Sequence, residues 1–202
     1  LTTTWVRGMP EQPNLYERWS SFARVTVQGN PRRKQPALGW GISRVYPKQR
    51  KFSQLILQID SAAGTFMTRF DGDVSKLDFL RYDITNLVHS IRRDARVAII
   101  GSGAGRDVLS ALAFDQKQVV AIEYNENVLD ALLNRFGDYS GHLDRNPRLR
   151  FVNDEGRSFL AREREPFDII QASFIDTWAA TAAGAFALAE NALYTVEAWE
   201  LF

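Results

Sequence analysis

Three glycines alternate with other residues in the segment VAIIGSGAGRDVLSAL, which covers residues 97–112. Gly101, Gly103 and Gly105 follow a short apolar run and directly precede an amphipathic segment. Glycines at a turn from a strand to a helix let a ligand approach the backbone and accept hydrogen bonds from its N–H groups. The spacing is G-x-G-x-G, whereas dinucleotide sites favour G-x-G-x-x-G, so a tight turn without a ligand is the alternative.

An acid stands at the distance at which nucleoside-binding folds place one. Glu123 ends the next apolar run, 22 positions after Gly101, where a carboxylate can accept the hydroxyl groups of a ribose. A solvated acid at the end of a strand is the alternative. Asp107 already complements the N-terminus of the intervening helix, which disfavours a pyrophosphate there. These residues favour a nucleoside without phosphates, such as S-adenosylmethionine, over NAD.

Further acids follow the later apolar runs. Asp154 and Glu155 come after the third run, and Asp176 comes after the fourth. In an open parallel sheet the ligand lies outside the carboxyl ends of the strands, so these side chains are expected at one edge. Carboxylates gathered there favour a cationic ligand, such as a sulfonium cofactor or a polyamine. The alternative is that each acid caps the helix that follows it.

Alternating strands and helices must position these groups. Apolar runs predict strands at 96–100, 118–123, 149–152 and 167–172. Amphipathic segments predict helices at 76–91, 106–114, 126–136 and 158–163. A polar loop is expected over 137–147 and a helix-prone tail over 178–202. This order predicts an α/β fold with a parallel sheet that is covered on both faces.

The first part of the chain has a different character. Alternating apolar and polar residues and turn signals predict short strands at 22–27, 40–47, 54–60 and 64–73, after an extended lead-in over 1–20. We therefore expect two domains. A small antiparallel β domain would occupy residues 1–75, and the nucleoside-binding domain would occupy residues 76–202.

Composition limits the function classes. The net charge of +1 creates no global attraction to nucleic acid or to a membrane. The sequence has no cysteine and two histidines, so disulfides and thiolate metal sites are excluded and no metal is expected. No apolar run reaches the roughly 20 residues of a spanning helix. We expect a cytoplasmic location and no nucleic-acid partner.

The two ends of the sequence predict that it is a piece of a longer protein. It starts at Leu1 and stops within the helix-prone segment TVEAWELF. The parallel sheet would then be incomplete on its C-terminal side, with the fourth strand as an open edge. We expect such a fragment to be marginally stable or aggregation-prone, unless a partner covers that edge. Membrane helices could lie elsewhere in the full protein.

The order of five segments resembles one family. The segments VAIIGSGAGRDVLSAL, VVAIEYNENVLDALLNRF, RLRFVNDEGRSFL, FDIIQASFIDTWAA and ENALYTVEAWELF are similar to those of the spermidine synthase (polyamine aminopropyltransferase) family. The resemblance covers roughly residues 16–202 and is closest to bacterial spermidine synthase-like proteins, some of which carry membrane helices. It implies a β-hairpin domain followed by a Rossmann-like fold of the class I methyltransferase type, often in a homodimer.

The resemblance also implies a reaction and a cofactor site. An aminopropyl group would pass from decarboxylated S-adenosylmethionine to a polyamine, with release of methylthioadenosine. The three glycines would face the sulfonium end of the cofactor, and Glu123 would hold the ribose. Asp154 and Glu155 would complete the cofactor site, because Glu155 falls where the family has an acid that contacts the adenine amine.

The amine side of the site departs from the family pattern. Asp176 matches the second acid of the family's Asp-x-x-Asp motif, but Ser173 replaces the first. Tyr194 matches a tyrosine-containing segment that follows this motif. Tyr82 and Asp83 fall near a Tyr-His-Glu segment that implies substrate binding. Since a serine hydroxyl is a weak base, Asp176 would have to deprotonate the amine alone, or the chemistry differs.

Two other functions remain open at this point. The chain could be an S-adenosylmethionine-dependent methyltransferase on the same fold, or a non-catalytic domain that binds an adenosyl ligand. Ser173 in the place of an acid favours the non-catalytic domain, and Ala104 is a second departure, because the family has an acid at this place in its glycine segment. Phe174 and Trp178 are candidates for a pocket wall or for the core, and His89 is expected to be a helix histidine with satisfied hydrogen bonds and not a base.

Overall fold

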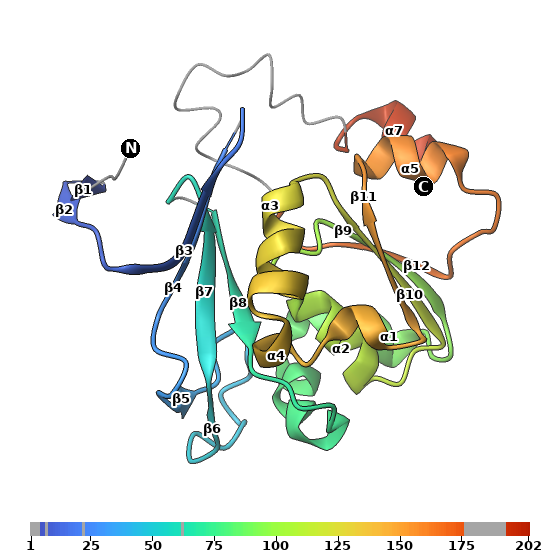
Figure 1. Ribbon diagram of the computed structural model, residues 1–202. Helices are drawn as coiled ribbons and strands as arrows, with labels where there is room; N and C mark the ends of the chain where they lie inside the picture. Colours follow the sequence, from blue (N-terminus) through green and yellow to red (C-terminus); the bar gives the residue numbers. More distant parts are fainter. Residues whose placement is uncertain (1–4, 7, 22, 62, 176–192) are drawn as a thin grey trace.

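The computed structural model describes residues 5–6, 8–21, 23–61, 63–175 and 193–202 (Figure 1). A four-stranded antiparallel sheet with the order β3-β4-β7-β8 comes first in the chain. Its strands are β3 (Asn14–Trp19), β4 (Arg24–Gln28), β7 (Gln54–Ile59) and β8 (Ala63–Thr68). Two small antiparallel pairs accompany it, namely β1 (Trp5–Val6) with β2 (Met9–Pro10) and β5 (Gln35–Pro36) with β6 (Lys51–Phe52).

The second sheet is parallel and has the order β11-β10-β9-β12. Its strands are β9 (Arg96–Ile100), β10 (Gln118–Glu123), β11 (Leu149–Asn153) and β12 (Ile169–Ala172). The central strands β9 and β10 are almost wholly buried, which explains their continuous apolar sequence, because both faces of such a sheet are covered. The predicted α/β fold and the preceding antiparallel sheet are confirmed.

Helices occupy both faces of the parallel sheet. They are η1 (Val74–Tyr82), η2 (Ile84–Asn86), α1 (Leu87–Ile91), α2 (Arg106–Ala113), α3 (Glu126–Leu129), the π-helical η3 (Asp130–Arg135), α4 (Gly137–Ser140), η4 (Leu143–Arg145), α5 (Gly156–Arg162) and α7 (Val196–Leu201). The helices α2, α3 and α4 lie between the two sheets, whereas α5 and α7 lie on the opposite face of the parallel sheet (Figure 1). No helix within the described ranges has the length and apolar character to span a membrane.

Alternate residues of the parallel strands enter two different cores. Val97 and Ile99 belong to a large cluster that also contains Val25 and Leu55 of the antiparallel sheet. Ala98, with other residues of the opposite face, belongs to a smaller cluster under α5. Since side chains alternate across a strand, this division follows from the period of two. The two sheets share the larger core, and α2 is packed between them.

The single helix that was predicted over 76–91 is wrong. The segment consists of η1, η2 and α1, and Asp83 between the first two is extended, with φ −98° and ψ 126°. Asp83 forms an isolated bridge with Ile42, and its carboxylate accepts a hydrogen bond from the N–H of Thr85. This local bond competes with a helical backbone. Three apolar residues of the predicted helix, Ile84, Leu87 and Ile91, are exposed.

Other boundaries also differ from the prediction. Residues 40–47 form no strand beyond the bridge at Ile42. The lead-in contains β3, whose residues pair with β4 through a register irregularity near Asn14. The polar loop over 137–147 contains α4 and η4. Of the helix-prone tail, α7 is described, and residues 176–192 lie outside the described part of the chain.

Candidate functional site

The glycine turn joins β9 to α2 in a left-handed backbone conformation. The φ angles of Gly101, Gly103 and Gly105 are +72°, +51° and +81°, a region that residues with a Cβ rarely adopt. A Cβ on Gly101 would lie 2.8 Å from Cγ2 of Ile175, and one on Gly103 would lie 3.1 Å from Cγ2 of Thr65. On this side of the turn, the protein's own side chains make the close approach that the sequence predicted for a ligand.

Glu123 lies beside this turn, as predicted. It ends β10, it is only 7% exposed, and its Oε2 accepts a hydrogen bond of 3.0 Å from the N–H of Gly103. Its Oε1 accepts a second bond of 3.0 Å from the N–H of Asn125. Burial raises the pKa of Glu123 above its ordinary value of 4.5, and the backbone hydrogen bonds oppose this rise without cancelling it.

The loops around Glu123 contain unused polar atoms. Among the described residues, Ser102 Oγ and Asn125 Nδ2 are buried and have no hydrogen-bond partner. Such groups are uncommon in native proteins, where nearly all buried polar atoms are hydrogen-bonded. A carboxylate that accepts, an amide that donates and a hydroxyl that does both match the hydroxyl groups of a ribose. The residues present therefore fit the ribose of a nucleoside.

The acids after β11 have structural partners. Glu155 is the N-cap of α5, and its carboxylate accepts hydrogen bonds of 2.9 and 2.8 Å from the N–H groups of Arg157 and Ser158. Burial alone would raise the pKa of Glu155, but these N–H donors outweigh it and hold the pKa below its usual value. Asp154 forms an ion pair with Arg162 of α5. Glu155 thus has the capping geometry that was the alternative to a ligand contact.

A buried charge cluster lies on the other side of the glycine turn. Arg106, 4% exposed, forms an ion pair with Asp83 and a second one of 2.9 Å with Asp107. Asp83 Oδ2 also accepts a hydrogen bond of 3.1 Å from the N–H of Trp40. We call Asp83, Arg106 and Asp107 the buried triad. It ties the antiparallel part of the chain to the start of α2.

The two acids of the buried triad have opposite pKa shifts. Burial raises the pKa of Asp83, but Arg106 and the N–H groups of neighbouring residues outweigh it and hold that pKa below its usual value. Burial dominates for Asp107, whose pKa is raised although Arg106 and Ser173 oppose the rise. One guanidinium therefore serves two carboxylates. A further cation, such as an ammonium or a sulfonium, would balance the remaining negative charge.

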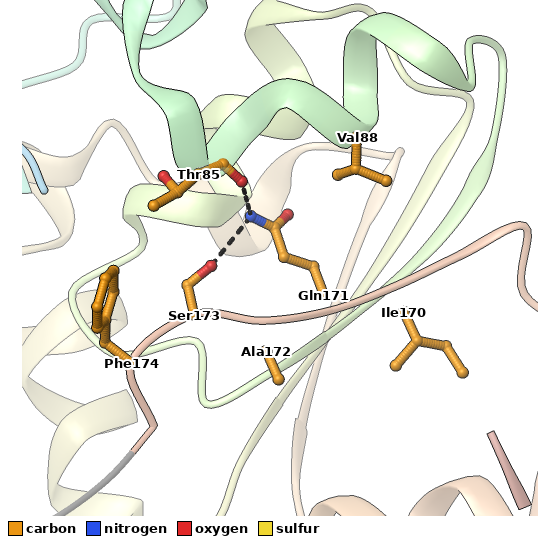
Figure 2. A pocket seen from close by; sticks show the side chains of 7 residues that line it. All are labelled: Thr85, Val88, Ile170, Gln171, Ala172, Ser173 and Phe174. Atoms are coloured by element: carbon orange, nitrogen blue, oxygen red, sulfur yellow. Dashed lines mark hydrogen bonds between the residues drawn. The ribbon is translucent and has the colours of Figure 1, made fainter. Parts of the chain in front are cut away.

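Ser173 follows β12 and lies at the wall of a hollow of about 400 Å³. Figure 2 shows Gln171 and Ser173 pointing toward Thr85, while Ile170 and Ala172 point to the other face of the strand. Gln171 Nε2 donates to Ser173 Oγ over 3.2 Å and to the carbonyl oxygen of Thr85 over 3.4 Å, and Thr85 Oγ1 donates over 3.0 Å to Asp83 Oδ1. The structure thus brings Ser173 and Asp83, two predicted site residues, to opposite ends of one polar network.

Tyr82 and Tyr194 were also predicted as site residues. The ring of Tyr82 packs on Tyr46 with a centroid distance of 5.0 Å. Tyr194 is 51% exposed and lies just before α7. Asp176 and Trp178 lie outside the described residues.

Three functional candidates were missed from the sequence. Asp107 was considered only as a charge at a helix N-terminus, although it is 6% exposed and forms an ion pair with Arg106. Gln171 and His89 were not linked, although His89 Nε2 lies 2.9 Å from Gln171 Oε1. A usable signal was present, because Gln171 and Ser173 are alternate polar residues at the end of an apolar strand and must share one face.

These features define a class of protein: an α/β protein with a Rossmann-like parallel sheet and a candidate nucleoside site at the carboxyl ends of its strands. Two solved structures share this fold. A spermidine synthase from Thermotoga maritima superposes with a TM-score of 0.51 and 19% identity, over 82% of this chain and 48% of that chain. A spermidine synthase in complex with the transition state analogue AdoDATO gives 0.50 and 18%, over 79% and 47%.

Sequence comparison points to the same family. The polyamine aminopropyltransferase of Buchnera aphidicola subsp. Schizaphis graminum (strain Sg) is 26% identical over an alignment of 136 residues, and the match covers 62% of this chain and 46% of that protein. The enzyme of the same name from Buchnera aphidicola subsp. Acyrthosiphon pisum (strain Tuc7) is 24% identical over 131 residues, again 62% and 46%. The chain thus spans about half the length of the curated relatives it matches. No family model matches it. The chain is spermidine synthase-like, and the predicted resemblance is confirmed.

Proposed function

We propose that this chain is part of an aminopropyltransferase that moves an aminopropyl group from decarboxylated S-adenosylmethionine to a polyamine. The contact between Glu123 and the glycine turn carries the proposal, because it joins a ribose-type acceptor to the backbone that would face the sulfonium end. The names of the curated relatives support this choice of reaction.

The two flanks of the turn suit the two ends of the reaction. Glu123 and the unused amide of Asn125 would hold the ribose hydroxyls. The negative charge of the buried triad would favour a cationic amine on the side of Ser173. The resemblance adds to this amine side Asp176, outside the described residues, and Tyr194.

The chemistry asks for a proton acceptor and not for a metal. Decarboxylated S-adenosylmethionine supplies a carbon next to a positively charged sulfur, and the nitrogen of the amine must attack that carbon. A polyamine has a pKa of about 10, as lysine does, so it is an ammonium at neutral pH and cannot attack. The protein must therefore hold the amine and take its proton.

Product analysis tests the proposal directly. The full-length protein is incubated with a polyamine and either decarboxylated S-adenosylmethionine or S-adenosylmethionine, and the products are separated by mass spectrometry. Methylthioadenosine formed from the decarboxylated form is the expected product. S-adenosylhomocysteine would instead indicate a methyltransferase. Tight binding without any product would indicate a non-catalytic adenosyl-binding domain.

A matched pair of variants tests the contact between Glu123 and the glycine turn, on which the proposal depends. Glu123→Gln removes a charge-assisted acceptor that is worth about 1.5–3 kcal/mol. Calorimetric titration with methylthioadenosine should therefore show binding at least about 10-fold weaker. The control is Glu126→Gln, which changes an exposed side chain three positions after Glu123. This variant should bind methylthioadenosine as the wild type does. Equal binding by both variants would contradict the role of Glu123.

A further inference from the structure

One segment of the chain has a large excess of positive charge, which the net charge of the whole sequence hides. Residues 29–53, between β4 and β7, contain no acid and seven cations, namely Arg32, Arg33, Lys34, Arg44, Lys48, Arg50 and Lys51. The other residues contain 18 Lys and Arg and 24 Asp and Glu, a net charge of −6 against +7 for the segment. We call residues 29–53 the basic arm.

The fold brings the two basic ends of this arm together. Strand β5 pairs with β6 through Gln35 with Phe52 and Pro36 with Lys51. Lys34 directly precedes β5, so cations from positions far apart in the arm flank one short ribbon. Figure 1 shows β5 and β6 at the lower end of the antiparallel sheet, away from α5 and α7. The charges therefore gather at one end of the molecule.

These cations are exposed and almost wholly without acidic partners. All seven side chains of the arm are exposed to solvent. Among the described residues, only Arg50 forms an ion pair, with Asp78. The remaining six cations repel one another, and a surface with negative charge would relieve this repulsion.

The arm has an ordered backbone and is not a solvated tail. Tyr46 is 6% exposed, and its hydroxyl donates a hydrogen bond of 3.1 Å to Asp78 Oδ1. The N–H of Ser43 donates a bond of 2.7 Å to the carbonyl oxygen of Tyr82. Because the backbone that presents the cations is already ordered, binding costs less conformational entropy than it would in a flexible segment.

The arm lacks the features by which proteins bind nucleic acids. Proteins that bind single strands stack bases on exposed rings, but Tyr46 is buried and Phe52 packs on Phe79 with a centroid distance of 4.5 Å. Trp40 packs on two phenylalanine rings. Residues 29–53 are all described and contain no helix that could enter the groove of a duplex.

An apolar side chain among the cations fits a lipid surface better. Val45 is 79% exposed and directly follows Arg44. At the boundary of a bilayer, cations contact the headgroups while apolar side chains enter the acyl region. A nucleic acid offers Val45 no such apolar layer.

We propose that the basic arm is a docking surface for a lipid bilayer with anionic headgroups. Its six unpaired cations contact the phosphate and carboxylate groups of the lipids, and Val45 enters the boundary between headgroups and acyl chains. The inference goes beyond the proposed function and does not depend on it, because binding to a bilayer requires no reaction.

Vesicle binding by the full-length protein tests the inference. We expect binding to vesicles of phosphatidylcholine with phosphatidylserine to be much tighter than binding to phosphatidylcholine alone. Salt should remove this difference, because the Debye length falls from about 10 Å at 0.1 M to about 3 Å at 1 M. Each cation near such a surface strengthens binding about fivefold. The triple variant Arg32→Gln, Arg33→Gln, Lys34→Gln should therefore bind about 100-fold more weakly.

A matched triple variant separates the arm from net charge. Arg135→Gln, Arg145→Gln and Arg164→Gln together remove the same charge from exposed side chains outside the arm. This variant should bind the anionic vesicles within about threefold of the wild type, because charges beyond a Debye length are screened.

A fluorescent label reports whether the arm itself meets the bilayer. Residues 1–202 contain no cysteine, so Val45→Cys provides a site for an environment-sensitive dye. Its emission should shift to the blue when anionic vesicles are added and should not shift with phosphatidylcholine alone. Val196→Cys, at a valine of α7 that is 71% exposed, is the control and should show no shift.

Four results would overturn the inference. They are equal binding of the wild type to both kinds of vesicle, an equal loss in the two triple variants, an unchanged emission of the label at position 45, and tighter binding to a duplex DNA than to the anionic vesicles at the same salt concentration. The last result would assign the arm to nucleic acid. Since no activity is measured, each of these failures leaves the proposed function untouched.

Discussion

The two flanks of the glycine turn both contain a buried acid, but they treat its charge in opposite ways. Glu123, 7% exposed, is held by N–H groups of the backbone, and burial raises its pKa. Asp83, 3% exposed, faces Arg106, and its pKa is lowered. At Glu123 the neutral donors only lessen the cost of burying the carboxylate, whereas at Asp83 the guanidinium of Arg106 and nearby N–H groups together more than offset it.

This difference between the two acids indicates which part of the ligands each flank of the proposed site would bind. The flank of Glu123 has hydrogen-bond acceptors and little compensation of charge, which suits hydroxyl groups of a nucleoside. The flank of Asp83 and Asp107 is an ion network, which suits an ammonium group that must be held and deprotonated. A single five-residue turn separates the two environments.

The largest expected effect comes from breaking the ion network. Arg106→Met leaves Asp83 and Asp107 buried without their cation. Removal of one partner from a buried ion pair lowers the free energy of unfolding by about 3–5 kcal/mol. Urea unfolding of the full-length protein measures the loss. Arg148→Met, which breaks an ion pair with the exposed Asp115, should cost less than about 1 kcal/mol. Equal losses would mean that burial does not distinguish the two pairs.

The second-largest loss of stability is expected from a substitution in the glycine turn. Gly101→Ala forces a left-handed backbone on alanine, at about 1–2 kcal/mol, and adds a contact of 2.8 Å to Ile175. Gly72→Ala has a φ of +90° but no atom within 4 Å of the new Cβ, so it isolates the backbone cost. Unfolding by denaturant should show that Gly101→Ala costs about 1–3 kcal/mol more, because of the overpacking. A smaller loss of stability in Gly101→Ala than in Gly72→Ala would show that the Ile175 side chain moves away from the new Cβ at little cost.

A pH dependence of stability sharpens the comparison next. The unfolded Glu123 ionises at its ordinary pKa of 4.5, whereas the folded one still holds its proton there. The wild type therefore loses stability relative to Glu123→Gln as the pH rises from 4.5 through the raised pKa, by up to about 1.4 kcal/mol per pH unit. Unfolding free energies of both proteins between pH 4 and 8 measure this difference. A difference that grows in favour of the wild type would contradict the raised pKa.

The smallest effect on stability is expected at Glu155, the acid that follows β11 and caps α5. Glu155→Ala removes the N-cap of α5 and should cost about 0.5–2 kcal/mol, whereas Glu155→Ser keeps a capping oxygen and should cost less. Thermal unfolding compares the two. Weaker binding of methylthioadenosine by Glu155→Ser, at unchanged stability, would show that this acid also contacts the ligand, as the family resemblance implies.

Sequence patterns predicted the parallel sheet well and the segment before it poorly. The four parallel strands were found within two residues of their ends, because continuous apolar runs are typical of strands buried on both faces. The helix over 76–91 failed because spacing alone does not register the competing hydrogen bonds of Asp83. In the site, Glu123 could be placed by its distance from the glycines, but Asp107 and Gln171 could not.

What the sequence alone determines about this protein is therefore local. The apolar runs specify the strands, the glycines permit the left-handed turn, and the position of Glu123 at a strand end places it beside that turn. Only the tertiary structure decides that Arg106 pairs with Asp83 and that Gln171 donates a hydrogen bond to Ser173. The physical reason is that burial and charge pairing depend on residues far apart in the chain, which periodicity and propensity do not contain.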